Sequence, residues 1–232
     1  ALASVMQVTS GSADMTILPH ADPQAKKFFD LETLFTNGAT GRNLLGATGK
    51  SVKISVPPAG ADGGRPTLSL DVLGLSSAAI TAITSAGTLD ASLPAQSTDC
   101  AWTGFGTPTG HCGFDLEFNN NAEYDPQVGT SPLAYNLGKF SITGSITTVF
   151  SITAGHEYKL AYDAWNGTSG AAPAATAMSL VITFPSAATA TFTLSCIWDE
   201  PAEIEDQGNI KVVKLPFRVP YVGAASPQVV IT

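Results

Sequence analysis

The clearest shortage in this sequence of 232 residues is charge. Lys, Arg, Asp and Glu together make up 13% of the residues, about half of the ~25% that is usual for a globular protein. No Lys or Arg occurs between Arg65 and Lys139. Conventional DNA binding needs basic patches that release counterions from phosphate, so this composition argues against it.

The charge that is present is mostly negative, with a formal net charge of -8. Carboxylates gather in the span without bases and in a second cluster at residues 199–206 (DEPAEIED). Those of the first span are Asp71, Asp90, Asp99, Asp115, Glu117, Glu123 and Asp125. Two interpretations stay open: a solvated acidic surface, or a wall past which nucleic acid slides without binding.

Cysteines and long apolar runs are also scarce. The chain has 3 cysteines, and an odd number without a signal peptide argues against a disulfide framework. The first fifteen residues have neither a basic nor an apolar signal-peptide region. No apolar run approaches the ~18 residues that would span a bilayer. We therefore expect a soluble protein that folds in a reducing compartment and has no membrane partner.

Signatures of catalysis and cofactor binding are missing as well. No G-x-S-x-G motif occurs, and the glycine-rich pieces lack the Lys of a phosphate-binding loop. Asp115 and Glu117 share a strand face, but such a pair is more often solvated polarity than a glycosidase site. Cys100, His111 and Cys112 are three metal-like ligands without the fourth that structural zinc needs. We expect no enzyme activity, no metal and no cofactor.

What the sequence does have is strand pattern. Period-two alternation of apolar and polar residues predicts about nine to eleven strands. The clearest segments are 50–56, 66–75, 114–118, 141–153, 157–164, 177–184, 190–198, 210–219 and 227–232. One Ala-rich segment at about 76–86, preceded by a possible Ser76 cap and followed by Gly87, predicts a short helix. Residues 26–36 have helical spacing but are too short to assign.

The predicted fold is therefore mostly β: an antiparallel sandwich or barrel with one short flanking helix and long loops. Residues 1–25 are small and polar, and we expect them to form an extended N-terminal arm. Residues 26–232 are expected to form a single β-sandwich domain, since this length suits one large β domain.

The most informative stretch is residues 114–150, FDLEFNNNAEYDPQVGTSPLAYNLGKFSITGSITTVF. A half-buried strand runs into a polar loop, Asn119–Asn136, and a second strand follows after Gly138. Loops of this length in compact domains usually carry a function or an interaction.

This stretch resembles the centre of tail tube proteins of long, non-contractile-tailed bacteriophages. The resemblance is carried by the strand, the long loop and the segment Gly138–Thr147, which reads GKFSITGSIT. It extends to the C-terminal part, where an acidic linker precedes DQGNIKVVKLPFRV and a short last strand, SPQVVIT. Residues 114–150 and 177–232 carry the resemblance.

The resemblance implies a structural subunit of the virion that is assembled in the host cytoplasm. Subunits of this family form hexameric rings that stack into a hollow tube, and DNA passes through it without specific binding. Other tail proteins would contact the tube ends. The candidate inter-ring loop residues are Asn119, Asn120, Asn121, Tyr124, Asp125 and Tyr135. The candidate lumen residues are Asp71, Asp115, Glu117, Glu123 and Asp125.

Two alternatives remain at this point. Another phage tail ring protein, a distal tail or terminator protein, would share much of this pattern. A carbohydrate-binding or adhesin-like sandwich would instead keep Trp102 and Trp165 exposed as stacking platforms for sugars.

Overall fold

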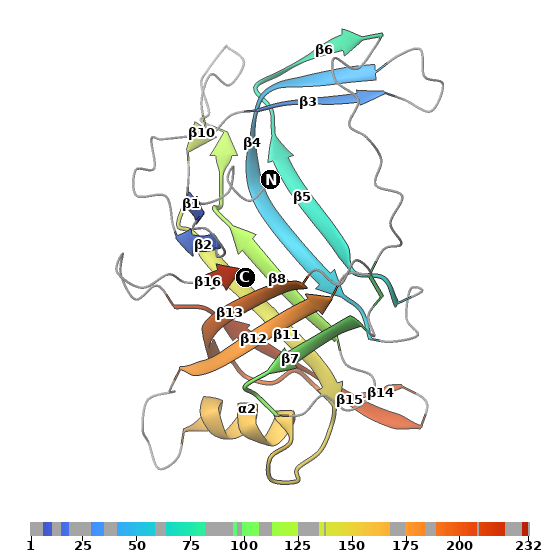
Figure 1. Ribbon diagram of the computed structural model, residues 1–232, viewed down its shortest axis with the longest axis vertical. Coiled ribbons are helices and arrows are strands. Elements are labelled where there is room, and N and C mark those ends of the chain that lie inside the picture. The colour runs from blue at the N-terminus through green and yellow to red at the C-terminus, as the bar shows by residue number, and fades with distance from the viewer. Residues whose placement is uncertain are drawn as a thin grey trace.

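The computed structural model is built mainly from antiparallel β-strands, with one helix among the residues it describes (Figure 1). The described residues are 7–10, 15–18, 29–34, 41–58, 64–81, 95–96, 99–106, 113–124, 135–136, 138–167, 175–183, 189–207, 209–220 and 229–231. The mostly-β fold with one short helix is confirmed.

Sixteen strands are described in these ranges. The first eight are β1 (Gln7–Ser10), β2 (Met15–Leu18), β3 (Phe29–Leu34), β4 (Gly41–Val56), β5 (Thr67–Leu73), β6 (Ser76–Ile80), β7 (Cys100–Thr103) and β8 (Gly113–Asn119). The others are β9 (Glu123–Tyr124), β10 (Tyr135–Asn136), β11 (Ser141–Val149), β12 (Thr176–Thr183), β13 (Thr189–Trp198), β14 (Glu205–Gln207), β15 (Ile210–Arg218) and β16 (Val229–Ile231). The helix is α2 (Glu157–Asn166).

Fourteen of these strands belong to one folded sheet that does not close. We call β5, β4, β8, β11 and β15, in that order, the first leaf. We call β7, β12, β13, β16, β2 and β1 the second leaf. The leaves meet at β13, whose first eight residues pair with β12 while Ile197 and Trp198 pair with β15. A single strand thus belongs to both layers of the sandwich.

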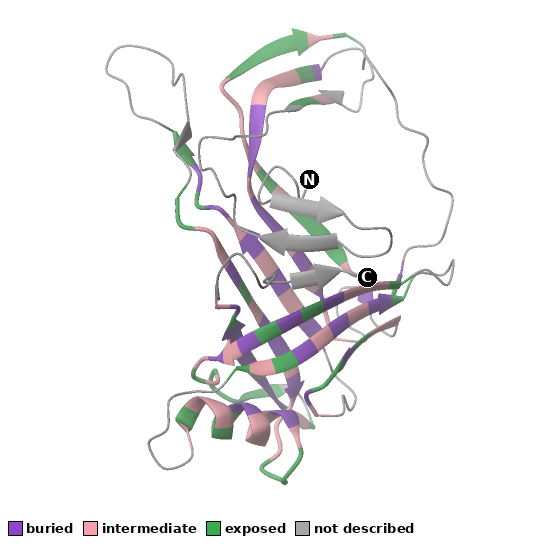
Figure 2. Ribbon diagram, turned by 60° about the vertical axis from the view of Figure 1, so that its left-hand side comes forward, coloured by how far each residue is buried: buried purple, intermediate pink, exposed green. Residues whose placement is uncertain are grey.

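The hydrophobic core lies between the two leaves. In Figure 2 buried and more exposed residues alternate along the crossing strands. From the first leaf come fully buried Leu116, Phe118 and Ile146, and from the second come Met178 and Leu180. This alternation is the sequence pattern that predicted the strands, because successive side chains point to opposite faces of a strand.

The predicted helix at 76–86 is wrong in position. Ser76–Ile80 is strand β6, which pairs with Gly41–Leu45, the projecting end of β4. That end of β4 bends away at Gly46, which has a φ of +57°, and pairs with β3 on one side and with β6 on the other. Ladder hydrogen bonds there outweigh the local helix preference of the two alanines. Residues 82–86 lie outside the described part of the chain.

The helix is α2, where the sequence pattern predicted a strand at 157–164. Tyr158, Leu160 and Tyr162 alternate with period two, so the strand pattern and the helix pattern overlap. The helix is favoured by contacts between residues four apart, which lie on neighbouring turns. Lys159 pairs with Asp163, and Tyr158 stacks on Tyr162. Gly167 ends the helix with a φ of +70°. The helix packs on β13, β11 and β15 at one end of the sandwich (Figure 1).

The segment at residues 26–36 contains β3, which pairs with the projecting end of β4 opposite β6. Within the predicted arm, residues 1–25, the described pieces are β1 and β2. They pair with each other, and β2 pairs with β16 in the second leaf. The division into an arm and a single domain stays a prediction.

Candidate functional site

The outer face of the first leaf is polar across four neighbouring strands. Residues directly opposite each other in a ladder share a face of the sheet. One row across β4, β8 and β11 is Lys53, Glu117 and Thr143, and the next is Ser55, Asp115 and Ser145. Thr143 in turn lies opposite Arg218 of β15. We call this surface the polar face; its members are Ser51, Lys53, Ser55, Asp115, Glu117, Asn119, Ser141, Thr143, Ser145, Thr147, Lys214 and Arg218.

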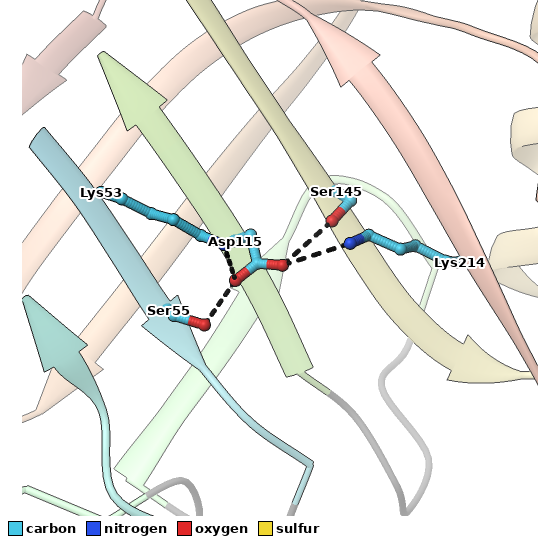
Figure 3. Close-up of polar contacts among 5 residues, drawn as sticks. All are labelled: Lys53, Ser55, Asp115, Ser145 and Lys214. Atoms are coloured by element: carbon cyan, nitrogen blue, oxygen red, sulfur yellow. Dashed lines mark hydrogen bonds and ion pairs between the residues drawn. The ribbon is translucent and has the colours of Figure 1, made fainter. Parts of the chain in front are cut away.

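Asp115 lies at the centre of the polar face, between two lysines from different strands (Figure 3). Its Oδ1 accepts a hydrogen bond from the Ser55 hydroxyl and lies 3.6 Å from the Lys53 ammonium. Its Oδ2 accepts from the Ser145 hydroxyl at 3.5 Å and from the Lys214 ammonium at 3.4 Å. Each carboxylate oxygen therefore faces one hydroxyl and one ammonium group.

This environment favours the ionised carboxylate. Burial raises the pKa of Asp115, but the hydrogen bond from Ser55 and the charges of Lys53 and Lys214 lower it more, so the pKa lies below its usual 3.8. Glu117 and Thr143 lie beside this group in the same shallow hollow of the surface. The hollow is thus charged but balanced, because two lysines and two carboxylates line it.

Gly144 lets β11 lie close to its neighbours beneath this hollow. A Cβ atom at this position would lie 2.4 Å from the Phe217 ring and 2.5 Å from the backbone oxygen of Asp115. The glycine of the SITGSIT segment is therefore required by packing, because any larger residue collides with both neighbours.

The structure brings two of the five predicted lumen residues onto the polar face and a third, Asp71, onto the neighbouring edge strand. Asp115 and Glu117 share it as the alternation predicted. Asp71, at the β5 edge, lies opposite Ser51 and accepts a hydrogen bond from its hydroxyl at 3.2 Å. Glu123 instead lies on β9, exposed at the base of the long loop. Asp125 lies outside the described residues.

The first residues of the Asn119–Asn136 loop are fixed by contacts within the subunit. Asn119 is the last residue of β8. Asn120 is buried, and its side-chain amide donates to the backbone oxygen of Gly49 at 2.7 Å. The Asn121 amide donates to the backbone oxygen of Lys139 at 2.7 Å, which links the two ends of the loop.

The middle of the loop is framed by a short ladder. Tyr124 and Glu123 of β9 pair with Tyr135 and Asn136 of β10. The Tyr124 hydroxyl also donates to the backbone oxygen of Gly74, at the turn between β5 and β6. The loop is thus the end of a β-hairpin anchored to the first leaf, and whether it contacts another ring stays a prediction.

Lys53, Lys214 and Ser55 are the site residues that sequence reasoning missed. Lys53 and Lys214 come from strands that lie outside the span without bases, and 99 residues separate Lys214 from Asp115. A signal existed, since both lysines occupy polar positions of alternating strands. What the sequence could not provide is the order of the strands, which places β4 and β15 near β8.

The residues considered for metal binding do not form a metal site in the described part of the chain. No group of three His, Cys, Asp or Glu side chains there is placed to hold a metal ion. His111 and Cys112 lie outside the described residues. Trp102 is only 3% exposed, so it offers no platform for a sugar. Among the described residues, no helix has the length and apolar character needed to cross a membrane.

Comparison with known families decides the class of the protein. Residues 2–219 match a family described as phage tail tube protein. The chain belongs to the phage tail tube protein family. A search of curated proteins finds no match. The resemblance seen in the sequence is confirmed, and membership in this family makes the chain a structural subunit of a phage tail.

Family membership also fixes the coarse partners and location. A tail tube protein assembles with copies of itself and with other tail proteins, and its place is the tail of the virion. The family is a structural one. Three features of this chain suit such an assembly: the polar face, the anchored hairpin, and the edge of the first leaf at β5, which pairs with β4 alone among the described strands.

Proposed function

We propose that the chain forms hexameric rings that stack into a hollow tail tube, and that viral DNA passes through its lumen into the host. In this arrangement the first leaves of neighbouring subunits join edge to edge, and their polar faces line the lumen. Assembly takes place in the host cytoplasm. The single observation that carries the proposal is the first leaf itself, which combines a polar outer face with an open edge at β5.

The open edge supports joining of subunits. β5 pairs with β4 alone among the described strands. Leu68 of β5 lies opposite Ile54, on the side of the sheet that faces the core, yet it is 65% exposed. An edge strand with an exposed core residue is a template for pairing with another chain. A neighbouring copy at this edge would extend both the sheet and the core.

The composition of the polar face supports a role as a passage wall. Short hydroxyl side chains and paired charges cover it, and the lysines beside Asp115 are already engaged. A wall of this kind offers phosphate few unpaired cations, so little counterion release would drive binding. The anchored hairpin and the N-terminal segment are proposed to contact the next ring.

Electron microscopy of the purified chain tests this function. We expect hollow tubes with sixfold rings, and tubes should disappear in Leu68→Asp while the subunit stays folded. Ile152→Asp is the control, because Ile152 is 71% exposed at a site away from β5. Loss of tubes in both variants would show that the effect of Leu68→Asp is not specific to the β5 edge. Single rings that never stack would indicate a distal tail or terminator protein instead.

Replacement of residues 125–134 by a two-residue Asn-Gly turn tests the part played by the hairpin. A two-residue turn can still join Tyr124 to its ladder partner Tyr135, so β9, β10 and the Asn121–Lys139 hydrogen bond should remain and the subunit should stay folded and soluble. We expect rings that no longer stack into tubes. Normal tubes from this variant would exclude the loop as an inter-ring contact.

A further inference from the structure

We propose that Asp115 is an internal counter-ion that holds the ammonium groups of Lys53 and Lys214 away from polyanions, and that without it the polar face becomes a two-lysine phosphate-binding site. The biological meaning rests on the proposed function, in which this face meets DNA. The structural claim concerns the subunit alone and can be tested without assembly.

The geometry assigns Asp115 this role. It is the one carboxylate within 4 Å of both lysines among the described residues. Its side chain is 26% exposed, whereas those of Lys53 and Lys214 are 45% and 54% exposed. The acid therefore lies deeper than the two bases, which fold over it from opposite sides. Ser55 and Ser145 donate to the same two oxygens and fix the orientation of the carboxylate.

A phosphate group could take the place of this carboxylate if it were absent. Phosphate oxygens accept hydrogen bonds from ammonium and hydroxyl groups as carboxylate oxygens do. With Asp115 neutralised, Lys53 and Lys214 would still flank the hollow, and Glu117 would supply its remaining negative charge. Both ammonium groups then lack the carboxylate that engages them in the native hollow, so they are available to a polyanion.

Two other acids, Glu117 and Asp163, differ from Asp115 in their contacts. Glu117 lines the same hollow, but its contact is with the Asn119 side-chain amide, which donates to its Oε1 at 3.2 Å. Asp163 also pairs with a lysine, Lys159, but on α2, far from the polar face. Glu117 is therefore the control for loss of one negative charge in the hollow, and Asp163 is the control for loss of a lysine–carboxylate pair elsewhere.

The experiment measures binding of a fluorescent 12-base-pair DNA duplex to the full-length chain by anisotropy, at concentrations where light scattering shows no assembly. Asp115→Asn should bind at least tenfold more tightly than the wild type at low salt. The slope of log affinity against log salt should steepen by about 1.8, since two more phosphates are neutralised at about 0.9 each. Inorganic phosphate at millimolar concentration should compete.

The controls separate the counter-ion role from a simple change in net charge. Glu117→Gln and Asp163→Asn each remove one negative charge, and both should bind less than threefold more tightly than the wild type. The triple variant Asp115→Asn, Lys53→Met, Lys214→Met should return to wild-type affinity. Equal gains in all three single variants would overturn the proposal.

A measurement on the wild type covers the case in which Asp115→Asn does not fold. Amine-reactive labelling followed by peptide mapping should modify Lys53 and Lys214 more slowly than Lys139, which is exposed. Equal rates would overturn the proposal. If the wild type forms tubes but Asp115→Asn binds DNA no more tightly, the counter-ion role alone is rejected. If Asp115→Asn binds DNA more tightly but the wild type forms no tubes, the proposed function alone is rejected.

Discussion

Gly144 of β11 and Phe217 of β15 lie opposite each other, and the phenyl ring fills the space that a side chain at residue 144 would need. Gly144→Ala should therefore destabilise the fold by about 1–3 kcal/mol, the usual cost of overpacking a core. Urea unfolding measures this change. Thr143→Ala, on the exposed polar side of the same strand, should change stability by less than 1 kcal/mol, and equal effects would contradict the packing argument.

A second variant separates the two collisions at residue 144. Adding Phe217→Leu to Gly144→Ala removes the ring contact but leaves the contact with the Asp115 backbone oxygen. In the Phe217→Leu background, Gly144→Ala should lower the free energy of unfolding by less than it does in the wild type, but by more than zero. Full recovery would show that the backbone contact costs nothing.

The ionised Asp115 should stabilise the fold in a pH-dependent way. Its pKa is lower in the folded chain than the ordinary 3.8, so its contribution is fully present above that value. It is lost as pH falls through the folded pKa, because the unfolded chain then binds the proton first. Asp115→Asn should cost roughly 1.5–3 kcal/mol at pH 7. The gap between wild type and variant should narrow below about pH 4 in urea titrations.

Glu157 carries a buried carboxylate that depends on Thr148. The Thr148 hydroxyl donates to Glu157 Oε2 at 3.3 Å, and both residues are fully buried. Thr148→Val should destabilise by about 1–3 kcal/mol, because it leaves a buried acceptor without its donor. The control is Thr147→Val, the neighbouring threonine on the polar face. An equal effect of both substitutions on thermal unfolding would refute the pairing.

The two described cysteines should be slow to react with thiol reagents. Burial and the neighbouring Asp99 raise the pKa of Cys100 to about 11, and burial raises that of Cys196 to about 12. Since the thiolate is the nucleophile, very little reactive form exists near pH 7.5. Maleimide labelling with peptide mapping should modify both residues at least tenfold faster in urea than in buffer. Rapid labelling of either residue in the native protein would contradict these shifts.

Local patterns in the sequence predicted much of the first leaf. Phe114, Leu116 and Phe118 face the core, and Asp115 and Glu117 face away, because alternation alone decides which side of a strand is buried. The helix was misplaced because helix propensity is only a local preference, which tertiary contacts can override. At 76–80 it is outweighed by ladder pairing with the projecting end of β4.

The site needed information that local patterns do not contain. The span between Arg65 and Lys139 has no base, which suggested an acidic surface. The lysines that balance Asp115 come from β4 and β15, and only the order of strands brings them there. Asn120 likewise seemed part of a polar loop, but its amide is buried against the backbone of Gly49. Long-range pairing therefore decides the chemistry of this face.

The single strand shared by both leaves also has a mechanical consequence. Because β13 continues from the second leaf into the first without a loop, a twist applied to one leaf reaches the other through covalent backbone and ladder hydrogen bonds. The stacked Phe105 and Trp198 rings fill the corner where it crosses. Under torsion or internal pressure the sandwich would respond as one stiff body, with little slip between its layers.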